Sequence, residues 1–323
     1  MRNLIIDGNN LAYRARYSFD LSNNGEDVSI TYGFLRVLFS MMSKFKPDTI
    51  TVTWDYGIPE HRRKHMPEYK SNRKAKKIED SDYEDMIRQM NLLHQKLPMF
   101  GIVSVRIPSC EADDIMYHAS RIYKGHSIIV STDEDMMQAI TDEPPIVKVY
   151  HPSKEIMYGK KEFEDEYGIE LDQLVYWKAL QGDSSDNISG VRGIGPKIAT
   201  TLFNKWGNLT KIINVALGID PDKSMSESLA KKIVATGESK LNTNVYVIAL
   251  FADRAGARNH IRRNISKWMP VSIPSVKRFL INNSFVSLVD KVGLLRKLER
   301  PEFCDNKRYP IVCNYRSPYG KNK

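Results

Sequence analysis

The sequence is poor in cysteine and has no long apolar run. Its three cysteines, Cys110, Cys304 and Cys313, are far apart and form no CxxC pair, so neither a disulfide framework nor a zinc site is predicted. The first ten residues hold only a short apolar run, which is typical of a core strand rather than a signal peptide. No run is long enough to span a bilayer. We therefore expect a protein of the reducing cytoplasm with no membrane contact.

Internal repeats and low-complexity tracts are also lacking, and negative charge is outnumbered. The 323 residues are 41% hydrophobic, an ordinary fraction for a globular protein with a core, and carry a formal net charge of +9. Nucleic acid is the usual polyanionic partner of such a surface. Charge alone leaves a membrane surface, or simple solubility, open as alternatives.

Strand and helix patterns alternate over about residues 1–170, which predicts an α/β domain. Three β-branched runs, at 4–7, 50–55 and 128–133, each end in an aspartate and are typical of buried parallel strands. A fourth strand is expected at 102–107, and helices at 32–45 and 111–123. Residues 171–295 are expected to form a helical domain, and residues 296–323 a basic C-terminal tail.

A basic insertion interrupts the α/β pattern, since no strand is expected over about residues 57–98. Residues 61–77 hold eight basic side chains against one acid, Glu68, a net charge of +7. A charge run is usually a solvated loop. Because this one has almost a single sign and follows an aspartate-terminated strand, we favour contact with a polyanion. The basic residues are Arg62, Arg63, Lys64, Lys70, Arg73, Lys74, Lys76 and Lys77.

Carboxylates follow the predicted strands in unusual number. Ligands of open α/β sheets bind beyond the carboxyl ends of the strands, where these side chains would emerge. A single aspartate there is often only a helix cap, but capping needs one acid per element, and the stretches EADD and DED supply several. Such a cluster predicts hard divalent cations, with Mg²⁺ favoured, and the absence of interleaved His or Cys argues against zinc. The candidate ligands are Asp7, Asp55, Glu111, Asp113, Asp114, Asp133, Asp135, Asp183 and Asp186.

A glycine-rich turn, GVRGIGPK at 190–197, lies between two helical patterns. Gly193 and Gly195 would let the backbone approach a phosphate, and Pro196 suits the first position of a helix. The N–H groups at that helix start, with Lys197 beside them, would bind a phosphate. An ordinary helix–helix turn is the alternative, but the GDSSDN stretch directly upstream makes phosphate binding the stronger prediction.

These motifs, in this order, resemble the flap endonuclease / 5′→3′ exonuclease family, which includes the 5′-nuclease domain of bacterial DNA polymerase I and stand-alone bacteriophage homologues. The resemblance covers about residues 2–255 and departs slightly at Trp54, where relatives often have Phe. Residues from about 256 onward match no motif. The chain is most similar to the phage enzymes, which would place it in a bacterial host cell. The motifs are LIIDGNN (4–10), PEYKSNR (67–73), EADD (111–114), STDED (131–135) and GDSSDNISGVRGIGPK (182–197).

The resemblance implies roles that the residues alone do not establish. The insertion would be a helical arch for a single-stranded 5′ flap, with Lys70 and Arg73 as catalytic basic residues and Tyr69 as a stacking platform. The glycine turn would belong to a helix–three-turn–helix motif that grips duplex DNA and can hold K⁺. Two Mg²⁺ ions, replaceable by Mn²⁺, would be held at two groups of carboxylates. Asp7, Asp55, Glu111 and Asp113 form the first, Asp133, Asp135, Asp183 and Asp186 the second, and Asp114 serves either.

The predicted function is that of a monomeric structure-specific 5′-nuclease that cuts DNA at flaps, nicks or 5′ ends and removes RNA primers or flaps beside replication proteins. Metal-activated water would attack the phosphorus in line and leave a 5′-phosphate and a 3′-hydroxyl. One alternative is an RNase H-like nuclease acting on RNA–DNA hybrids; another is a non-catalytic DNA-binding protein, which would gain nothing from anions near phosphate. A phosphatase is disfavoured because Gly8-Asn9-Asn10 supplies no second aspartate after Asp7.

Overall fold

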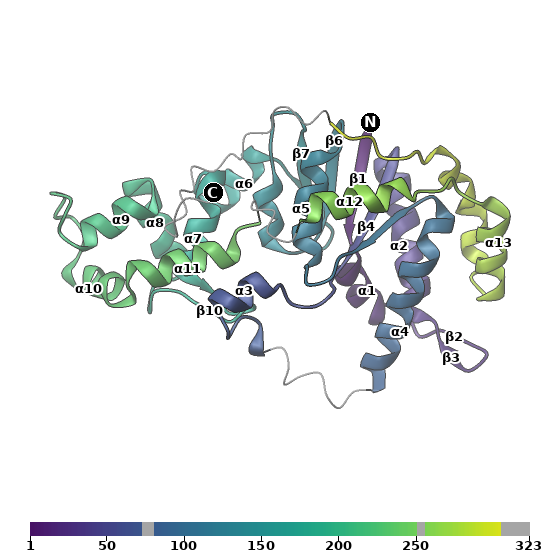
Figure 1. Cartoon of the computed structure of the whole chain (residues 1–323), viewed down its shortest axis with the longest axis horizontal. Helices are drawn as coiled ribbons and strands as arrows, with labels where there is room; N and C mark the ends of the chain where they lie inside the picture. The colour runs from purple at the N-terminus through teal and green to yellow at the C-terminus, as the bar shows by residue number, and fades with distance from the viewer. Residues whose placement is uncertain (73–80, 251–255, 305–323) are drawn as a thin grey trace. The chain divides into compact units, whose positions relative to one another are not determined.

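The computed structural model describes residues 1–72, 81–250 and 256–304, which divide into two compact units (Figure 1). Of these residues, the first unit holds 1–59, 81–159 and 256–304, and the second holds 60–72 and 160–250. The expected domains, 1–170 and 171–295, were each one continuous stretch. The contacts group the chain differently, because residues 256–304 pack with the first unit and residues 60–72 pack with the second.

A six-stranded sheet forms the centre of the first unit, in the order β5-β4-β1-β6-β7-β8. All neighbours are parallel except β8, which runs antiparallel to β7. This confirms the predicted mostly parallel α/β fold. The strands are β1 (Arg2–Asp7), β4 (Thr49–Trp54), β5 (Val103–Arg106), β6 (His126–Val130), β7 (Val147–His151) and β8 (Ile156–Tyr158), and a small hairpin adds β2 (Ser22–Asn23) and β3 (Glu26–Asp27).

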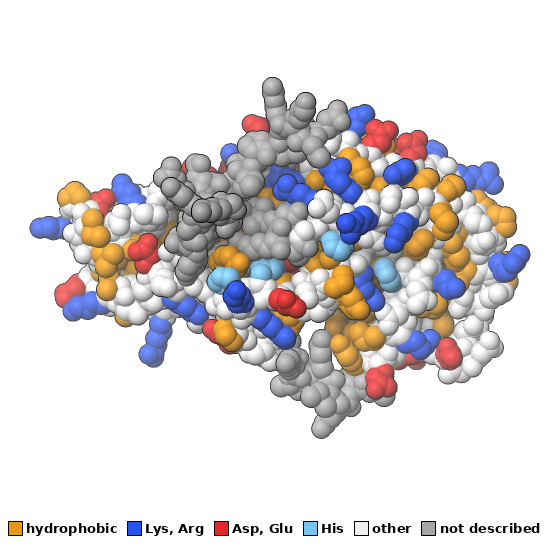
Figure 2. Space-filling model, viewed as in Figure 1, with side chains coloured by type: hydrophobic (Ala, Val, Ile, Leu, Met, Phe, Trp, Pro, Cys, Tyr) orange, Lys and Arg blue, Asp and Glu red, His pale blue; other side chains and the backbone are white. Residues whose placement is uncertain are grey.

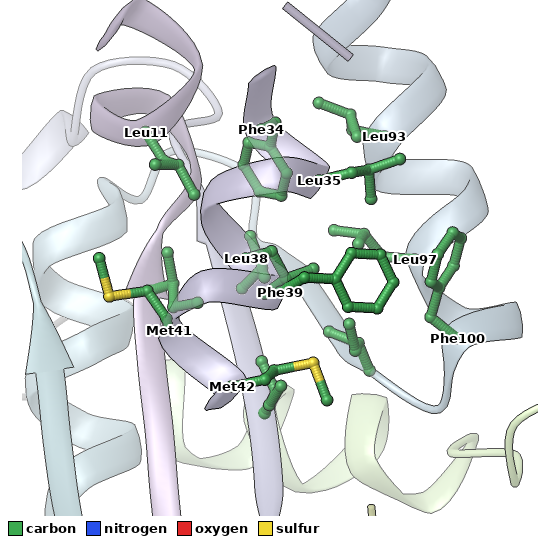
Figure 3. Close-up of a cluster of buried hydrophobic side chains, with 14 of the residues drawn as sticks. Leu11, Phe34, Leu35, Leu38, Phe39, Met41, Met42, Leu93, Leu97 and Phe100 are labelled. Carbon is green, nitrogen blue, oxygen red and sulfur yellow. The ribbon is translucent and has the colours of Figure 1, made fainter. Parts of the chain in front are cut away.

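Successive side chains of β1 point to opposite faces of the sheet, and each face has its own cover. Leu4 and Ile6 lie in a large apolar cluster with side chains of α2 (Ser29–Phe45) and α4 (Ser81–Lys96), part of which Figure 3 shows. The cluster continues through η2 (Leu97–Phe100), α13 (Ile273–Asn282) and η5 (Val286–Lys297). Other helices of this unit are α1 (Gly8–Arg16), α5 (Ala112–Ile122), η3 (Glu134–Ala139) and α12 (Ala257–Ser266), of which α12 packs on α5 and β5.

The second unit is helical, as predicted from Leu171 onward, and also contains a short hairpin. Its helix α3 (Glu60–His65), from the basic insertion, packs on α11, where Arg62 Nε donates a hydrogen bond to the Val247 carbonyl at 2.8 Å. The elements are α6 (Lys160–Tyr167), η4 (Leu171–Gln173), α7 (Leu174–Gln181), β9 (Gly182–Asp183), β10 (Ile188–Ser189), α8 (Pro196–Trp206), α9 (Leu209–Ala216), α10 (Glu227–Thr236) and α11 (Glu238–Ile248).

Several sequence-based expectations concern residues that lie outside the described ranges. The segment 73–80, between α3 and α4, and most of the predicted tail, 305–323, lie outside them. Within the described ranges, no helix is both long enough and apolar enough to cross a membrane.

Candidate functional site

Asp7 and Asp55 lie at the carboxyl ends of the adjacent strands β1 and β4. Asp7 caps α1, with its Oδ1 accepting a hydrogen bond from the Asn10 N–H at 2.9 Å. Asp55 directly follows β4, and its Oδ1 accepts one from the Ala112 N–H at 2.8 Å, which fixes the start of α5. The sheet edge thus receives acids from β1, β4 and the first turn of α5, as the sequence predicted.

Two asparagines tie this edge together, although the sequence does not predict a role for either. Asn9 Oδ1 accepts a hydrogen bond from the Asp55 N–H at 2.9 Å, and Asn10 Nδ2 donates one to the Thr132 hydroxyl beyond β6. Gly8 is required between them and Asp7, because a Cβ there would lie 2.7 Å from the Trp54 ring. The signal in the sequence was the pair of adjacent asparagines that follows Asp7 after a single glycine.

The remaining acids of the first unit line the starts of α5 and η3. Glu111 occupies the N-cap position of α5 without a capping hydrogen bond from its side chain, and Asp113 and Asp114 lie in the first turn; Glu111 and Asp114 are buried and Asp113 is half-buried. Asp133 caps η3, and its Oδ1 accepts a hydrogen bond from the Asp135 N–H at 2.8 Å. The acids at 111–114 and those at 133–135 therefore each lie at the start of a helix as well as at the carboxyl edge of the sheet.

The electrostatics of this edge are resolved at Asp7. Burial, followed by the charge of Asp55 and more weakly that of Asp133, raises the pKa of Asp7 to about 7, against the pull of hydrogen bonds from the Asn10 and Asn9 backbone. A nearby cation favours the charged form of a carboxylate whose pKa is raised in this way. The donors are all oxygens, the type preferred by hard divalent ions. The side chains therefore fit a divalent metal.

The acids do not, however, converge as they stand. Among the described residues, no group of three His, Cys, Asp or Glu side chains is placed to ligate one ion. Asp7, Asp55 and Asp133 instead each direct an oxygen to a backbone N–H. Mutual repulsion disfavours a closer approach of these carboxylates.

In the second unit, Asp183 has a cationic partner that is not predicted from the sequence. Its Oδ2 lies 2.9 Å from Lys178 Nζ, and both side chains are largely buried. Burial favours a higher pKa for Asp183, but the Lys178 charge and hydrogen bonds from Ser185 outweigh it and lower the pKa to about 2. The only signal for Lys178 was a lysine within the apolar pattern of α7.

Asp186 holds two residues of the basic insertion. The Tyr69 hydroxyl donates a hydrogen bond to Asp186 Oδ2 at 3.0 Å, and Lys70 Nζ lies 3.5 Å from the same oxygen. The structure thus brings together Tyr69, Lys70 and Asp186, which were predicted to serve one reaction. The Tyr69 side chain is only 3% exposed, so it offers no open face for stacking, in contrast to the predicted platform.

The other predicted DNA contacts of the insertion differ in accessibility. Arg63 and Lys64 are exposed on α3. Arg62, expected to contact DNA, is 2% exposed and holds α3 on α11, so its charge is not presented to solvent. With only six residues, α3 is too short for its sequence pattern to show which basic side chain faces inward. Arg73 and Lys74 lie outside the described residues.

The glycine turn leads into α8. Gly193 has φ +82°, in the left-handed region that favours glycine, and Gly195 precedes Pro196 at the first position of the helix. Apart from its two chain neighbours, no described residue has an atom within 4 Å of the place where a Cβ on Gly195 would stand, and Lys197 is exposed in the first turn. The helix start is therefore open to a ligand, with a cation beside it.

Two family models match adjacent stretches of the chain. The model of the 5′-3′ exonuclease N-terminal resolvase-like domain matches residues 2–168, and that of the 5′-3′ exonuclease C-terminal SAM fold matches residues 169–250.

Curated relatives agree with these matches. A 5′-3′ exonuclease of Buchnera aphidicola is 31% identical over 236 residues, which cover 71% of this chain and 78% of the relative. The thermostable DNA polymerase I of Thermus thermophilus is 29% identical over 315 residues, covering 96% of this chain but 35% of the polymerase. The chain thus spans about a third of the length of the polymerase relatives it matches.

Solved structures share the fold. The flap endonuclease of bacteriophage T5, solved with DNA and metal ions, superposes with a TM-score of 0.63 at 22% identity and covers 92% of this chain and 99% of its own. The T5 5′-exonuclease with bound zinc gives a TM-score of 0.64, also at 22% identity, over 93% of this chain and 100% of its own.

Proposed function

The chain belongs to the 5′-3′ exonuclease family, and on that premise we propose that it is a metal-dependent 5′-nuclease that hydrolyses DNA phosphodiesters as exonuclease and flap endonuclease. The supporting observation is the carboxylate edge of the first unit, where burial, followed by the charges of Asp55 and Asp133, raises the pKa of Asp7 to about 7. A protein that only bound DNA would gain nothing from anions placed to repel phosphate.

Divalent ions would be held in the first unit by Asp7, Asp55, Glu111, Asp113, Asp133 and Asp135, with Asp114 in support. When bound, such ions supply Lewis-acid stabilisation of phosphate oxygens and make water a better nucleophile near neutral pH. We propose Mg²⁺, in two sites, with Mn²⁺ as a substitute. The assignment of Asp183 and Asp186 to the second ion, and of K⁺ to the glycine turn, stays a prediction.

Basic residues of the second unit would bind the phosphate groups of the DNA. We propose that Lys70, with Arg73, neutralises charge that develops on the attacked phosphate. Lys70 is held beside Asp186, so its ammonium group is restricted before substrate arrives. The open start of α8, with Gly193, Gly195 and Lys197, would bind duplex backbone, and Arg63 and Lys64 would contact the displaced strand.

The likeness to polymerase relatives supports a role in removing RNA primers or 5′ flaps during replication. The substrates would be DNA with flaps, nicks or 5′ ends, and RNA–DNA hybrids are an alternative substrate. The named T5 relative was solved with DNA and metal ions. A monomer that acts beside replication proteins is the corresponding proposal for its assembly.

The test is cleavage of labelled 5′-flap, nicked-duplex, single-stranded and RNA–DNA substrates with Mg²⁺, with Mn²⁺ and with a chelator. We expect flap and 5′-end cleavage that chelation abolishes. Undiminished cleavage after chelation would exclude a metal-dependent reaction, cleavage of hybrids alone would favour the RNase H-like alternative, and binding without cleavage the non-catalytic one.

Variants of η3 provide an internal control for this test. Asp133→Asn and Asp135→Asn should each lower turnover by orders of magnitude while DNA binding is retained, because a ligand charge is lost and phosphate repulsion is relieved. Glu134→Gln removes the same charge from the exposed residue between them and should leave turnover near normal. Wild-type turnover in all three variants would mean that Asp133 and Asp135 are only caps.

A further inference from the structure

The base of the basic insertion is fastened to the GDSSDN loop by side chains that the proposed function does not use. Asn187 Nδ2 donates hydrogen bonds to the Glu68 carbonyl at 2.8 Å and to the Ser71 hydroxyl at 3.0 Å. Asn72 Nδ2 donates one in the opposite direction, to the Ser184 carbonyl at 3.0 Å. We call residues 68–72 and 184–187, joined by these bonds, the clasp.

The backbone of Lys70 lies at the centre of the clasp. Its N–H donates to the Asp186 carbonyl at 3.0 Å, and its φ is +53°, in the left-handed region that a lysine rarely adopts. Such a conformation persists only where surrounding bonds impose it. The bonds of Asn187 fall on Glu68 and Ser71, on either side of Tyr69 and Lys70, so they hold the turn in which Lys70 is kept in this conformation.

Asparagine suits position 187 for two separate reasons. Its own φ is +60°, and asparagine tolerates that region better than most residues. Its amide nitrogen also has two N–H groups, and the two acceptors use both. Glycine would accept the backbone but make neither bond, so substitution by glycine separates the two requirements.

We propose that Asn187 is a positioning residue, which acts through Lys70: it sets the turn that holds the Lys70 ammonium beside the Asp186 carboxylate. The loop with Asp183 and Asp186 and the base of the insertion then move as one body. This inference rests on the proposed function, in which Lys70 acts on the attacked phosphate. It assigns to the asparagine of GDSSDN the task of setting the place of a cation more than a hundred residues earlier in the chain.

The first test is Asn187→Gly, with Asn24→Gly as the matched control. Asn24 is also left-handed, with φ +53°, but lies exposed in the turn between β2 and β3. The rate of a single turnover at saturating enzyme should fall about 100-fold in Asn187→Gly, the order expected when a catalytic group is displaced by about 1 Å. DNA affinity measured in Ca²⁺ should stay unchanged, and the control should match wild type in both.

A double-mutant cycle distinguishes positioning from general damage. If Asn187 acts through Lys70, then Asn187→Gly should slow Lys70→Ala no further, because the group that it positions is gone. If the two losses multiply instead, Asn187 acts elsewhere and the proposal is overturned. Wild-type cleavage by Asn187→Gly, alongside an active parent, would reject this inference alone and leave the proposed nuclease function intact.

A second measurement needs no activity. Hydrogen exchange should quicken in Asn187→Gly at both halves of the clasp together, including the Lys70 amide, and should not change in Asn24→Gly. Should the wild-type protein cleave no substrate with any metal, the proposed function fails and exchange still decides the clasp. Unchanged protection at Lys70 would show that Asn187 does not hold it.

Discussion

At the scale of single residues, Asp7 shows how burial and neighbouring carboxylates oppose ionisation at the carboxylate edge. Its side chain is almost fully buried, and the charges of Asp55 and Asp133 oppose its ionisation. In the unfolded chain its pKa would lie near 3.8, whereas in the folded protein it is about 7. Between these values the folded protein keeps a proton that the unfolded chain has lost, so this group makes folding less favourable as pH rises.

This shift predicts a pH dependence of stability. In chelator, the free energy of unfolding of Asp7→Asn should exceed that of wild type increasingly from about pH 4 to about pH 7, and by a constant amount above that. Asn keeps an oxygen to accept the Asn10 N–H. Asp20→Asn, at an exposed position of the same unit, controls for overall charge. Denaturant titrations at pH 4, 6 and 8 measure the difference; a parallel pH dependence of both variants would contradict the raised pKa.

Residue roles that depend on tertiary contacts could not be predicted from the sequence. Arg62 and Arg63 are neighbours of one charge, yet one is buried on α11 and the other exposed. Tyr69 and Lys178 meet acids 117 and 5 positions away. A strand-ending aspartate, by contrast, is placed by the direction of its strand alone, which is why Asp7 and Asp55 could be predicted to share an edge.

At the scale of elements, the buried central strands were the most predictable. Runs of apolar and β-branched residues predicted β1, β4 and β6, because strands covered on both faces are built mostly from such residues. β7 and β8 were not predicted. Lys148 lies on β7 with its side chain exposed, and β8 has only three residues, so neither presents a long apolar run.

Variants of α13 test whether residues after 256 belong to the core of the first unit. Leu280 is fully buried in its apolar cluster, whereas its neighbour Ile281 is 56% exposed. Leu280→Ala should lower the free energy of unfolding by roughly 2–5 kcal/mol, and Ile281→Ala by less than about 1 kcal/mol. Urea unfolding of both variants checks this. Equal, small losses would show that α13 is only a surface appendage.

At the scale of the whole molecule, the excess of positive charge predicts how binding responds to salt. The chain carries +9, and Figure 2 shows Lys and Arg side chains on the visible face of each unit. If several phosphates are contacted, the logarithm of affinity should fall linearly with the logarithm of salt concentration, with a slope of roughly −0.9 per contacted phosphate of duplex. A flat dependence would contradict polyanion binding.

Single variants locate part of that slope. Lys197→Ala, at the start of α8, should reduce its magnitude by about one unit while a saturated single turnover keeps its rate. Lys277→Ala removes an equal charge from α13 and controls for net charge. Binding isotherms at several salt concentrations make the comparison. A loss of the saturated rate in Lys197→Ala would mean that the turn takes part in the reaction itself.

The two units are interleaved along the gene, and this limits how the protein could be recombined. The chain passes from the first unit to the second and back twice before residue 304. A crossover near residue 160 between distant relatives would separate α13 and η5 from the strands and helices whose apolar surfaces they cover. To exchange the helical unit intact, four junctions would have to be kept in register, two of them around the basic insertion. Because segments of the two units alternate along the chain, changes in one unit are expected to be inherited together with the intervening segments of the other unit.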